Sequence, residues 1–348
     1  MKKKIALIFG GCSPEYGVSL QSAYGVATHM DTDKYELIYI GVTRDGEWLL
    51  YSGDLEAIRD NTWMSGPCVR AALLPSRGMG GVLRIESESK TRVILIDAAF
   101  PVMHGKNGED GTIQGLLELA QIPIIGCGLS ASSICMDKDV AHRVAQSAGV
   151  CIPRCVTLYS VADLDWAITM IEDMVFPLFV KPARGGSSIG MTKLKSADGL
   201  KEAVEAAFSH DDKVLIEEGV SGAEVGCAVI GNGELILGEV DEIELNQFFF
   251  DFEEKYAQRN TRIHTPARIS AETSERIKRT AKELYRAMGC RGFARVDMFL
   301  TKDNEIVFNE INTIPGLTVN SRFPRMMACA GMPMEAVMDK LVQLATRV

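Results

Sequence analysis

Hydrophobic and polar positions in the first third of the chain alternate between strand and helix patterns. Residues 5–10 are a short apolar run ending in two glycines, which is typical of a buried strand that enters a tight loop. Residues 19–30 have helical spacing, while residues 35–42, 93–102 and 122–125 are further strand candidates. Strands that alternate with helices predict a parallel α/β sheet in this part of the chain.

From residue 131 onward the pattern changes to short strands, hairpins and several helices. Residues 271–288 are predicted to be a long helix, because apolar residues recur at helical spacing from Ile277 to Met288. Residues 295–300 and 305–311 are predicted to pair as a hairpin. Other predicted helices lie at 139–148, 160–174 and 334–346, and other predicted strands at 178–182, 191–194, 213–218, 224–230 and 235–240.

Composition narrows the class of protein. The chain has 348 residues, 47% hydrophobic and 24% charged, which is ordinary for globular proteins of two or three domains. Its net charge of −9 does not favour nucleic acid as a partner. No apolar run reaches the roughly 18 residues of a membrane span. Nine cysteines without zinc spacing favour buried thiols, so we expect a cytoplasmic protein that binds neither nucleic acid nor membrane.

A lysine followed by a glycine- and serine-rich loop is the first candidate for chemistry. Lys181 precedes Gly-Gly-Ser-Ser-x-Gly at 185–190, between two predicted strands. Backbone N–H groups and hydroxyls of such a loop can cover phosphates while the lysine pairs with their charge. The loop lacks the Gly-Lys-Ser/Thr ending of a Walker A motif. A flexible hairpin without a ligand is the alternative interpretation.

The predicted hairpin at 295–312 carries the second candidate site. With its turn centred on 302–303, Arg295 would lie opposite Glu310, and Asp297 opposite Phe308. Because strand residues two apart share a face, one face of the hairpin would then gather four polar side chains, namely Arg295, Asp297, Glu310 and Asn312. Two carboxylates and an amide oxygen suit Mg²⁺, with Mn²⁺ as an alternative ion. The two candidates together predict a nucleoside triphosphate with its metal, whereas a surface ion-pair ladder is the simpler alternative.

Three weaker signals are open to more than one interpretation. Residues 126–131 fit the dinucleotide pattern G-x-G-x-x-A, but no acidic residue follows at the ribose-binding distance. Glu15 follows the first strand, where a carboxylate can bind a ligand or simply favour a helix N-terminus. His104 also ends a strand, and by itself a structural role is the simpler reading.

The motifs, taken in order, resemble those of the D-alanine–D-alanine ligases of the ATP-grasp superfamily over essentially the whole chain. They are the glycine and serine residues around Glu15, the segments 104–105, 108–115 and 136–138, the loop 181–190, Glu254-Lys-Tyr256, Arg295-Val-Asp297 and the segment 310–316. The resemblance implies an N-terminal Rossmann-like α/β domain at 1–126. It further implies two ATP-grasp lobes of α+β structure, at 127–214 and 215–348.

The resemblance also implies a reaction and its residues. ATP would phosphorylate the carboxylate of D-alanine, and the amine of a second D-amino acid would attack the acyl phosphate to give the dipeptide of the peptidoglycan precursor. Catalytic roles would fall on Glu15, Ser187, Tyr256, Arg295 and the Gly316 N–H, and nucleotide binding on Lys138, Lys181, Glu217, Val220, Glu224 and Lys255. Mg²⁺ would be bound by Asp297, Glu310 and Asn312, and the substrates by Glu15, His104, Asp241, Phe250, Ser321 and Arg322.

The second substrate follows from a departure from the family pattern. The family usually has Ser-His-Ser followed by an apolar residue where this chain has Val319-Asn-Ser-Arg322. A buried arginine donor would stay unpaired against a methyl group but could bind a serine hydroxyl. The D-alanine–D-serine ligases of vancomycin resistance share this arginine and the phenylalanine at position 250, and Asp241 could orient the arginine. We therefore expect D-serine, with D-alanine as the alternative, while Glu-Lys-Tyr at 254–256 makes D-lactate less favoured.

Two other classes of function are weighed against the ligase. A catalytically silent ATP-binding module would not need Glu15, Ser187, Tyr256, Arg295 and Gly316 together. An oxidoreductase would depend on the glycines at 126–131 alone. The resemblance further implies a homodimer.

Overall fold

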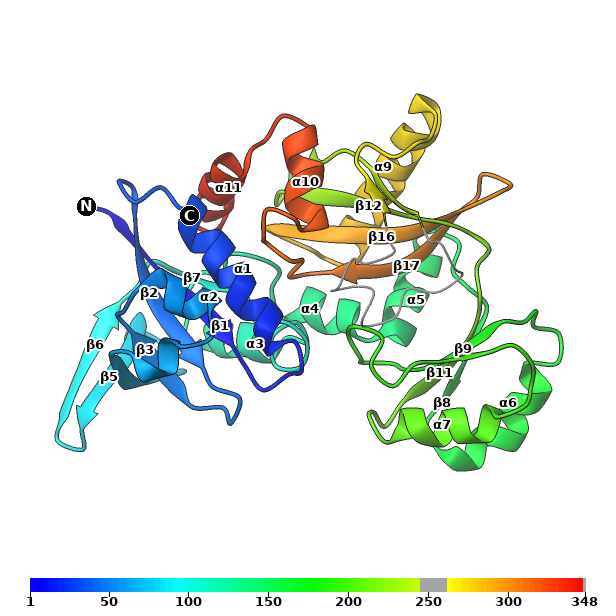
Figure 1. Ribbon diagram of the computed structural model, residues 1–348, viewed down its shortest axis with the longest axis horizontal. Coiled ribbons are helices and arrows are strands. Elements are labelled where there is room, and N and C mark those ends of the chain that lie inside the picture. The colour runs from blue at the N-terminus through cyan, green and yellow to red at the C-terminus, as the bar shows by residue number, and fades with distance from the viewer. Residues whose placement is uncertain (245–261, 347–348) are drawn as a thin grey trace.

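The computed structural model describes residues 1–244 and 262–346. Its elements fall around three β-sheets, which Figure 1 shows as a blue and cyan part, a green part and a yellow-green to orange part. Within the described residues no helix is long and apolar enough to cross a membrane. The combination of a mixed α/β sheet with two antiparallel sheets confirms the predicted fold class.

The first sheet has seven strands in the order β6-β5-β4-β3-β2-β1-β7. Strand β1, which lies between β2 and β7, is apolar throughout its inner part, because parallel strands are buried on both faces. Only β1, β2 and β7 run parallel, and the other strands extend the sheet in antiparallel fashion. The strands are β1 (Lys3–Gly10), β2 (Tyr35–Val42), β3 (Trp48–Tyr51), β4 (Cys68–Leu73), β5 (Gly81–Ser87), β6 (Lys90–Leu95) and β7 (Ala98–Pro101).

Two predictions for this region were wrong. The single strand expected at 93–102 is two strands, since the chain turns at Asp97, whose carboxylate accepts a hydrogen bond from the Lys4 N–H at 2.7 Å. The strand expected at 122–125 makes only an isolated parallel bridge between Ile124 and Ala99. Both errors arise because an apolar run does not show where the chain leaves the sheet.

Helices cover the first sheet, and one of them comes from the far end of the chain. The cluster that buries Ile5 and Leu7 also contains Val337 and Leu341 of the last helix, so the C-terminal segment returns to the N-terminal sheet. Figure 1 shows this helix beside α1. The helices here are α1 (Tyr16–His29), α2 (Leu55–Arg59), α3 (Thr112–Leu119) and α11 (Met334–Thr346).

The middle part of the chain builds a four-stranded antiparallel sheet in the order β10-β9-β11-β8. Helices α6 and α7 bury their apolar residues on it. A capping box formed by Ser160 and Asp163 begins the region predicted as a helix at 160–174. The elements are α4 (Leu129–Met136), α5 (Lys138–Ser147), β8 (Cys155–Leu158), α6 (Leu164–Met170), β9 (Leu178–Pro182), β10 (Thr192–Leu194), α7 (Leu200–Phe208) and β11 (Val214–Glu218).

The last part forms a sheet around β12 and β16, with the order β15-β14-β12-β16-β17 and β13 paired to β12. Helix α9 covers it with the predicted stripe, in which Ile277, Ala281 and Leu284 are fully buried. The elements are β12 (Gly222–Ile230), β13 (Ile236–Leu237), β14 (Asp241–Glu244), β15 (Arg262–His264), α9 (Ala271–Ala287), β16 (Phe293–Thr301), β17 (Ile306–Asn312) and α10 (Arg322–Cys329).

The hairpin β16–β17 is present, but its predicted register was wrong. Arg295 pairs with Asn312 and Asp297 with Glu310, and an irregularity after Asp297 then brings Met298 opposite Phe308. The extra residue is Asn309, which makes a bulge in β17. Because of this bulge, Phe308 can pack in the core with Met298 while Glu310, two positions on, faces the opposite side.

Candidate active site

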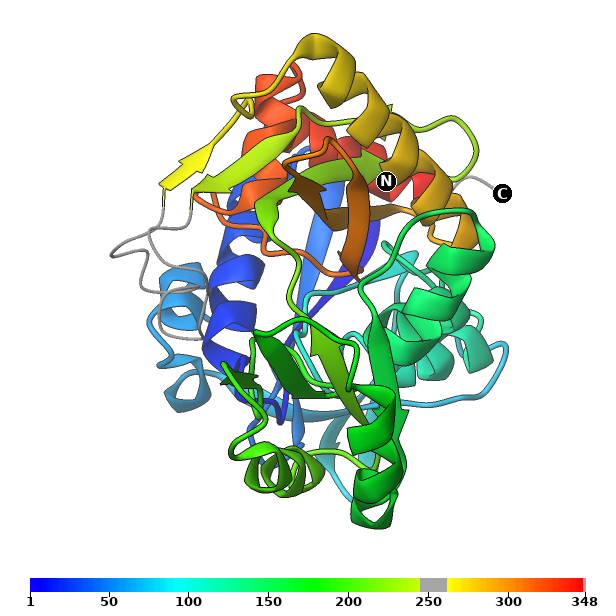
Figure 2. The same cartoon turned by 90° about the vertical axis from the view of Figure 1, so that its right-hand side faces the viewer.

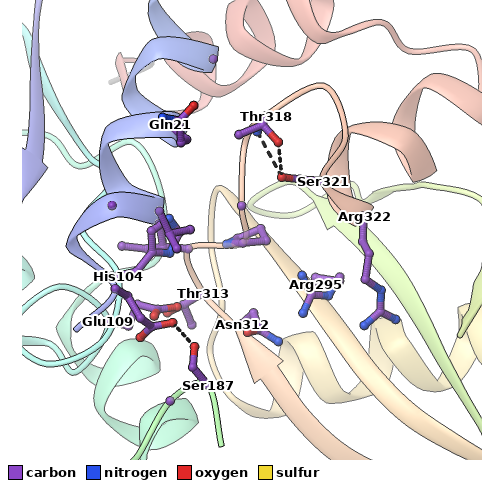
Figure 3. Close-up of a pocket in the computed structure, with 18 of the residues that line it drawn as sticks. Gln21, His104, Glu109, Ser187, Arg295, Asn312, Thr313, Thr318, Ser321 and Arg322 are labelled. Carbon is purple, nitrogen blue, oxygen red and sulfur yellow. Dashed lines mark hydrogen bonds between the residues drawn. The ribbon is translucent and has the colours of Figure 1, made fainter. Parts of the chain in front are cut away.

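A cavity of about 900 Å³ lies where the three parts of the chain meet. Its wall is formed by the start of α1, the segment around His104, the glycine-rich loop, the β16–β17 hairpin and the loop before α10. Figure 3 shows His104, Glu109 and Ser187 on one side of it and Ser321 and Arg322 on the other. In Figure 2, α1 lies close to the strands of the last sheet. Segments from four distant places in the sequence therefore share one space, since the loop before α10 directly follows the hairpin.

Glu15 and Ser187 meet at one end of the cavity. The buried Glu15 immediately precedes α1, and the Ser187 hydroxyl donates a hydrogen bond to its carboxylate. Two glycines make room for this carboxylate: a Cβ atom at Gly105 or Gly186 would come within 2.6 or 2.9 Å of Glu15 Oε2. The structure thus brings the glycine- and serine-rich loop onto the loop after β1, as a shared site requires.

His104 lies in the same wall but is held by other serines. Its Nε2 is 3.0 Å from the Ser22 hydroxyl, and the Ser13 hydroxyl donates to the His104 carbonyl at 2.7 Å. Burial lowers the pKa of His104 below its ordinary value, so its ring is neutral at neutral pH. Sequence reasoning missed Ser13 and Ser22. Ser13 lies in the loop after β1, and Ser22 lies in α1, the helix that follows this loop.

The two candidate phosphate-binding lysines lie on different elements. Lys138 is the first residue of α5; its Nζ donates to the Gly185 carbonyl at 2.7 Å and lies 3.9 Å from Glu310. Lys181, at the end of β9, is paired at 2.7 Å with Glu217 of β11, and both side chains are buried. Val220 lies in the turn that follows β11. Lys138 thereby connects the glycine-rich loop with the acidic hairpin.

The polar face of the hairpin is present as predicted. The Arg295 Nε donates to Asp297 Oδ1 at 2.9 Å and to Oδ2 at 3.0 Å. The Arg295 Nη2 donates to Asp297 Oδ2 at 2.6 Å. The Asn312 amide lies 2.9 Å from Asp297 and 3.4 Å from Glu310. In the described residues no three His, Cys, Asp or Glu side chains group as a metal site. The two carboxylates and the Asn312 amide are nonetheless hard-oxygen donors, which fit Mg²⁺.

Arg322 has a much larger set of partners than the sequence suggested. Its Nε and Nη2 each donate to Asp241 at 2.8 Å, its Nη1 donates to Glu224 at 3.0 Å, and Nη2 lies 3.3 Å from Asp297. This guanidinium crosses β12 over Gly226, where a Cβ atom would come within 2.5 Å of Nη2. The predicted link between Asp241 and Arg322 therefore exists, and Glu224 joins it.

The loop that precedes α10 contains the remaining predicted residues. The Thr318 N–H donates to the Ser321 hydroxyl at 3.2 Å, and the two hydroxyls are 2.8 Å apart (Figure 3). Gly316 lies against this serine, since a Cβ atom there would be 2.8 Å from Ser321 Oγ. Gly316 and Ser321 both line the cavity. Phe250, Lys255 and Tyr256 lie outside the described residues, so their predicted roles stay predictions.

The dinucleotide motif at 126–131 has a different role. The strand that such a motif requires is missing before it, because residue 124 makes only an isolated bridge. The backbone of Gly126 is packed against Gly292, where a Cβ atom would approach Gly126 to 2.8 Å. These glycines serve close packing between two parts of the chain, which leaves no room for a pyrophosphate at Gly126.

Sequence reasoning also missed Glu109, which lines the same cavity. Its Oε2 accepts a hydrogen bond from the Gly105 N–H at 2.8 Å. Burial and then the nearby Glu15 raise the pKa of the Glu109 carboxyl to about 8. The residue stands within the segment 108–115 that carried the resemblance, but no local pattern shows that it faces Glu15.

Family models match both halves of the chain. Residues 4–127 match the model described as D-ala D-ala ligase N-terminus, and residues 145–343 match the D-ala D-ala ligase C-terminus.

Individual relatives match over nearly the whole chain. The vancomycin/teicoplanin A-type resistance protein VanA of Enterococcus faecium is 44% identical, over 99% of this chain and 98% of its own length. A putative D-alanine–D-lactate ligase of Streptomyces coelicolor is also 44% identical, covering 98% and 97%. Among solved structures, the VanG D-Ala:D-Ser ligase of Enterococcus faecalis superposes with a TM-score of 0.92 at 48% identity, covering 99% of this chain and 100% of that one.

Proposed function

The chain belongs to the D-alanine–D-alanine ligase family and is an ATP-dependent D-alanine–D-X ligase of peptidoglycan precursor synthesis, and we propose that its second substrate is D-serine. One observation carries the choice of D-serine. Arg322 lines the substrate cavity with a guanidinium that has five N–H groups. Carboxylates face four of them, which leaves one Nη1 hydrogen without a partner in the described part of the chain.

An unpaired donor in the wall of a pocket favours a substrate that supplies an acceptor. The hydroxyl of D-serine can accept this hydrogen bond, whereas the methyl group of D-alanine would leave the donor unsatisfied. The similarity to the VanG D-Ala:D-Ser ligase supports the same choice. The D-lactate and D-alanine relatives also match this chain over nearly its whole length, so the choice of D-serine rests on Arg322 and not on overall similarity.

The first half of the reaction is assigned to the end of the cavity around Glu15. In this proposal Glu15 binds the ammonium group of D-alanine, and Ser187 holds the glycine-rich loop in place over the reacting carboxylate. Lys138 and Lys181 pair with phosphate charge, while Glu217, Val220 and Glu224 bind adenine and ribose. Covering the site protects the acyl phosphate from water, which would otherwise hydrolyse it.

The second half is assigned to the opposite end. Arg295 and the Gly316 N–H stabilise the negative charge that develops on the tetrahedral intermediate, and Ser321 binds the carboxylate of the second substrate. Asp297, Glu310 and Asn312 would hold Mg²⁺, which neutralises charge on the transferring phosphoryl group. Asp297 also forms ion pairs with Arg295 and Arg322, so its position is fixed before any ligand enters.

The test is product analysis with competing substrates. The enzyme is supplied with ATP, Mg²⁺, D-alanine and equimolar D-serine and D-lactate, and the products are separated by mass. D-alanyl-D-serine should be the main product, with ADP released in equal amount. D-alanyl-D-alanine as the main product would establish the alternative second substrate, and D-alanyl-D-lactate would contradict the role given to Arg322.

A further inference from the structure

Two carboxylates, Glu15 and Glu109, face the same end of the cavity. The proposed function assigns a substrate group only to Glu15. Glu15 and Glu109 both lie against Gly105. A Cβ atom at Gly105 would come within 2.6 Å of Glu15 Oε2, and the Gly105 N–H donates a hydrogen bond to Glu109 Oε2. Both residues line the cavity. Their charges act on each other, since Glu15 raises the pKa of Glu109. Without a positive charge beside it, the Glu109 carboxyl therefore holds its proton near neutral pH.

Glu109 has backbone donors but no cation. The N–H groups of Gly105 and Ile314 donate to its carboxylate. No lysine, arginine or histidine pairs with it within residues 1–244 and 262–346. A desolvated carboxylate beside a second one is costly unless a positive charge compensates it. The cavity is the open side of this pair, so a cationic group of a ligand that enters there can supply the missing positive charge and let Glu109 ionise.

The first substrate supplies such a cation. On the premise of the proposed function, D-alanine enters with its carboxylate toward the phosphates and its ammonium group toward Glu15. We propose that Glu109 is a second carboxylate of this ammonium subsite, so that Glu15 and Glu109 together bind the amino group of the first D-alanine. The positive ammonium carries three N–H donors, and two carboxylates can accept from it without displacing the Ser187 hydroxyl.

This arrangement gives Glu109 a role in selectivity. Two carboxylates bind an ammonium group more strongly than one carboxylate does. They also disfavour a first substrate that has no ammonium group. An amine-free acid such as propionate has the same carboxylate and the same methyl-bearing chain but cannot compensate the charge. Glu109 should therefore discriminate D-alanine from propionate at the first site, in addition to its contacts with the backbone.

The test compares two ligands in two proteins. Initial rates at saturating ATP and D-serine give the KM for D-alanine, and competition gives the inhibition constant of propionate, which lacks a nucleophile and cannot act as second substrate. Glu109→Gln should raise the KM for D-alanine roughly 10- to 100-fold, the range for a hydrogen bond to a charged group. The inhibition constant of propionate should change less than about threefold. Equal changes for the two ligands, or no change for either, would overturn the proposal.

Two variants separate this role from a structural one. Glu118→Gln is the matched control, because Glu118 is exposed and binds only the Leu129 N–H, at 2.8 Å; it should leave both constants unchanged. If Glu109→Gln does not fold, Glu109→Asp decides, since it keeps the charge but withdraws it; it should raise the D-alanine KM alone. If the unmodified protein makes no D-alanyl-D-serine, the proposed function fails; if only the ligand discrimination is absent, only the inference about Glu109 fails.

Discussion

At the scale of the residue, Arg322 shows how one side chain connects two binding regions. Its guanidinium spans from Asp241 to Glu224 and approaches Asp297, so the proposed second-substrate pocket and the proposed nucleotide site share it. Such a buried cation is tolerated because three carboxylates surround it. It also needs Gly226, because any Cβ there would occupy the path of Nη2. The arginine at this position therefore depends on a glycine almost a hundred residues earlier in the chain.

Replacing Arg322 by methionine should change the product. Arg322→Met removes the donor that we assign to the serine hydroxyl and offers an apolar surface to a methyl group. The ratio of D-alanyl-D-serine to D-alanyl-D-alanine should fall about 10-fold or more, since one unsatisfied polar group is worth about 1–3 kcal/mol. Products formed from equal concentrations of D-serine and D-alanine are measured by mass.

The control for this variant is Arg325→Met in the same helix. Arg325 donates only to the Ile263 carbonyl, at 3.1 Å, and has no carboxylate partner among the described residues. It should leave the product ratio unchanged. If Arg322→Met keeps the ratio of the unmodified enzyme, Arg322 does not select the second substrate.

At the scale of the element, the glycine-rich loop is fixed at its base. Arg184 lies between β9 and the loop, and its backbone N–H and its guanidinium both donate to Asp211, at 2.7 Å from the backbone and 2.6 Å from Nη2. Lys138 binds the next carbonyl, at Gly185. Ser187 and Ser188 adopt positive φ angles, which non-glycine residues rarely do. The anchored base thus supports an uncommon backbone conformation at the tip.

Loosening this base should weaken nucleotide binding. Arg184→Gln keeps the backbone hydrogen bond to Asp211 but loses the paired guanidinium, whose side chain is 43% exposed. Because partly exposed ion pairs contribute at most about 1 kcal/mol, the KM for ATP should rise no more than about fivefold. Steady-state kinetics with ATP varied at saturating amino acids measures the change.

The stability of this variant should hardly change. Arg279→Gln, an exposed residue of α9, is the matched control for lost surface charge and should leave the KM for ATP as it was. An unaltered KM in Arg184→Gln would show that the loop holds its conformation without this anchor.

At the scale of the whole molecule, the end of the chain fastens the N-terminal sheet. Asp339 of α11 accepts hydrogen bonds from the Tyr35 hydroxyl at 2.7 Å and from Lys34 Nζ at 3.2 Å. Both donors lie more than three hundred residues before Asp339 in the sequence. The hydrogen bond from Tyr35 lowers the pKa of Asp339 below its ordinary value of 3.8, and Lys34 lowers it further. The ionised carboxylate consequently stabilises the docked helix.

This contact predicts a pH-dependent loss of stability. Because folding lowers the pKa of Asp339, its contribution is present above the ordinary pKa and is lost as the pH falls through the folded-state pKa. Asp339→Asn should lower the unfolding midpoint by roughly 1–3 °C at pH 7. The difference from the unmodified protein should shrink as the pH falls below 3.8 and vanish once the pH lies below the lowered pKa of the folded state.

Thermal unfolding followed by circular dichroism at several pH values measures this difference. Asp303→Asn, in the exposed turn of the β16–β17 hairpin, controls for the loss of one negative charge. A difference that persists unchanged at acid pH would show that ionisation of Asp339 is not what stabilises the contact.

The sequence by itself determined the local parts of the site. Alternation along 295–312 was enough to predict that Arg295, Asp297, Glu310 and Asn312 share a face, because side-chain direction in a strand depends only on neighbouring positions. The lysine, glycine and serine pattern at 181–190 likewise predicted a loop between two strands. Most helices were predicted for the same reason, since their periodicity is local.

Only the tertiary structure decided how these parts meet. The bulge at Asn309 shifts the hairpin register by one position, and nothing in the alternating pattern shows an extra residue. The approach of Glu109 to Glu15 and the reach of Arg322 to Glu224 depend on distances between segments that are far apart in sequence. Such distances are set by how three sheets pack against one another, and this packing is a property of the whole chain, whereas periodicity is a property of a few neighbouring residues.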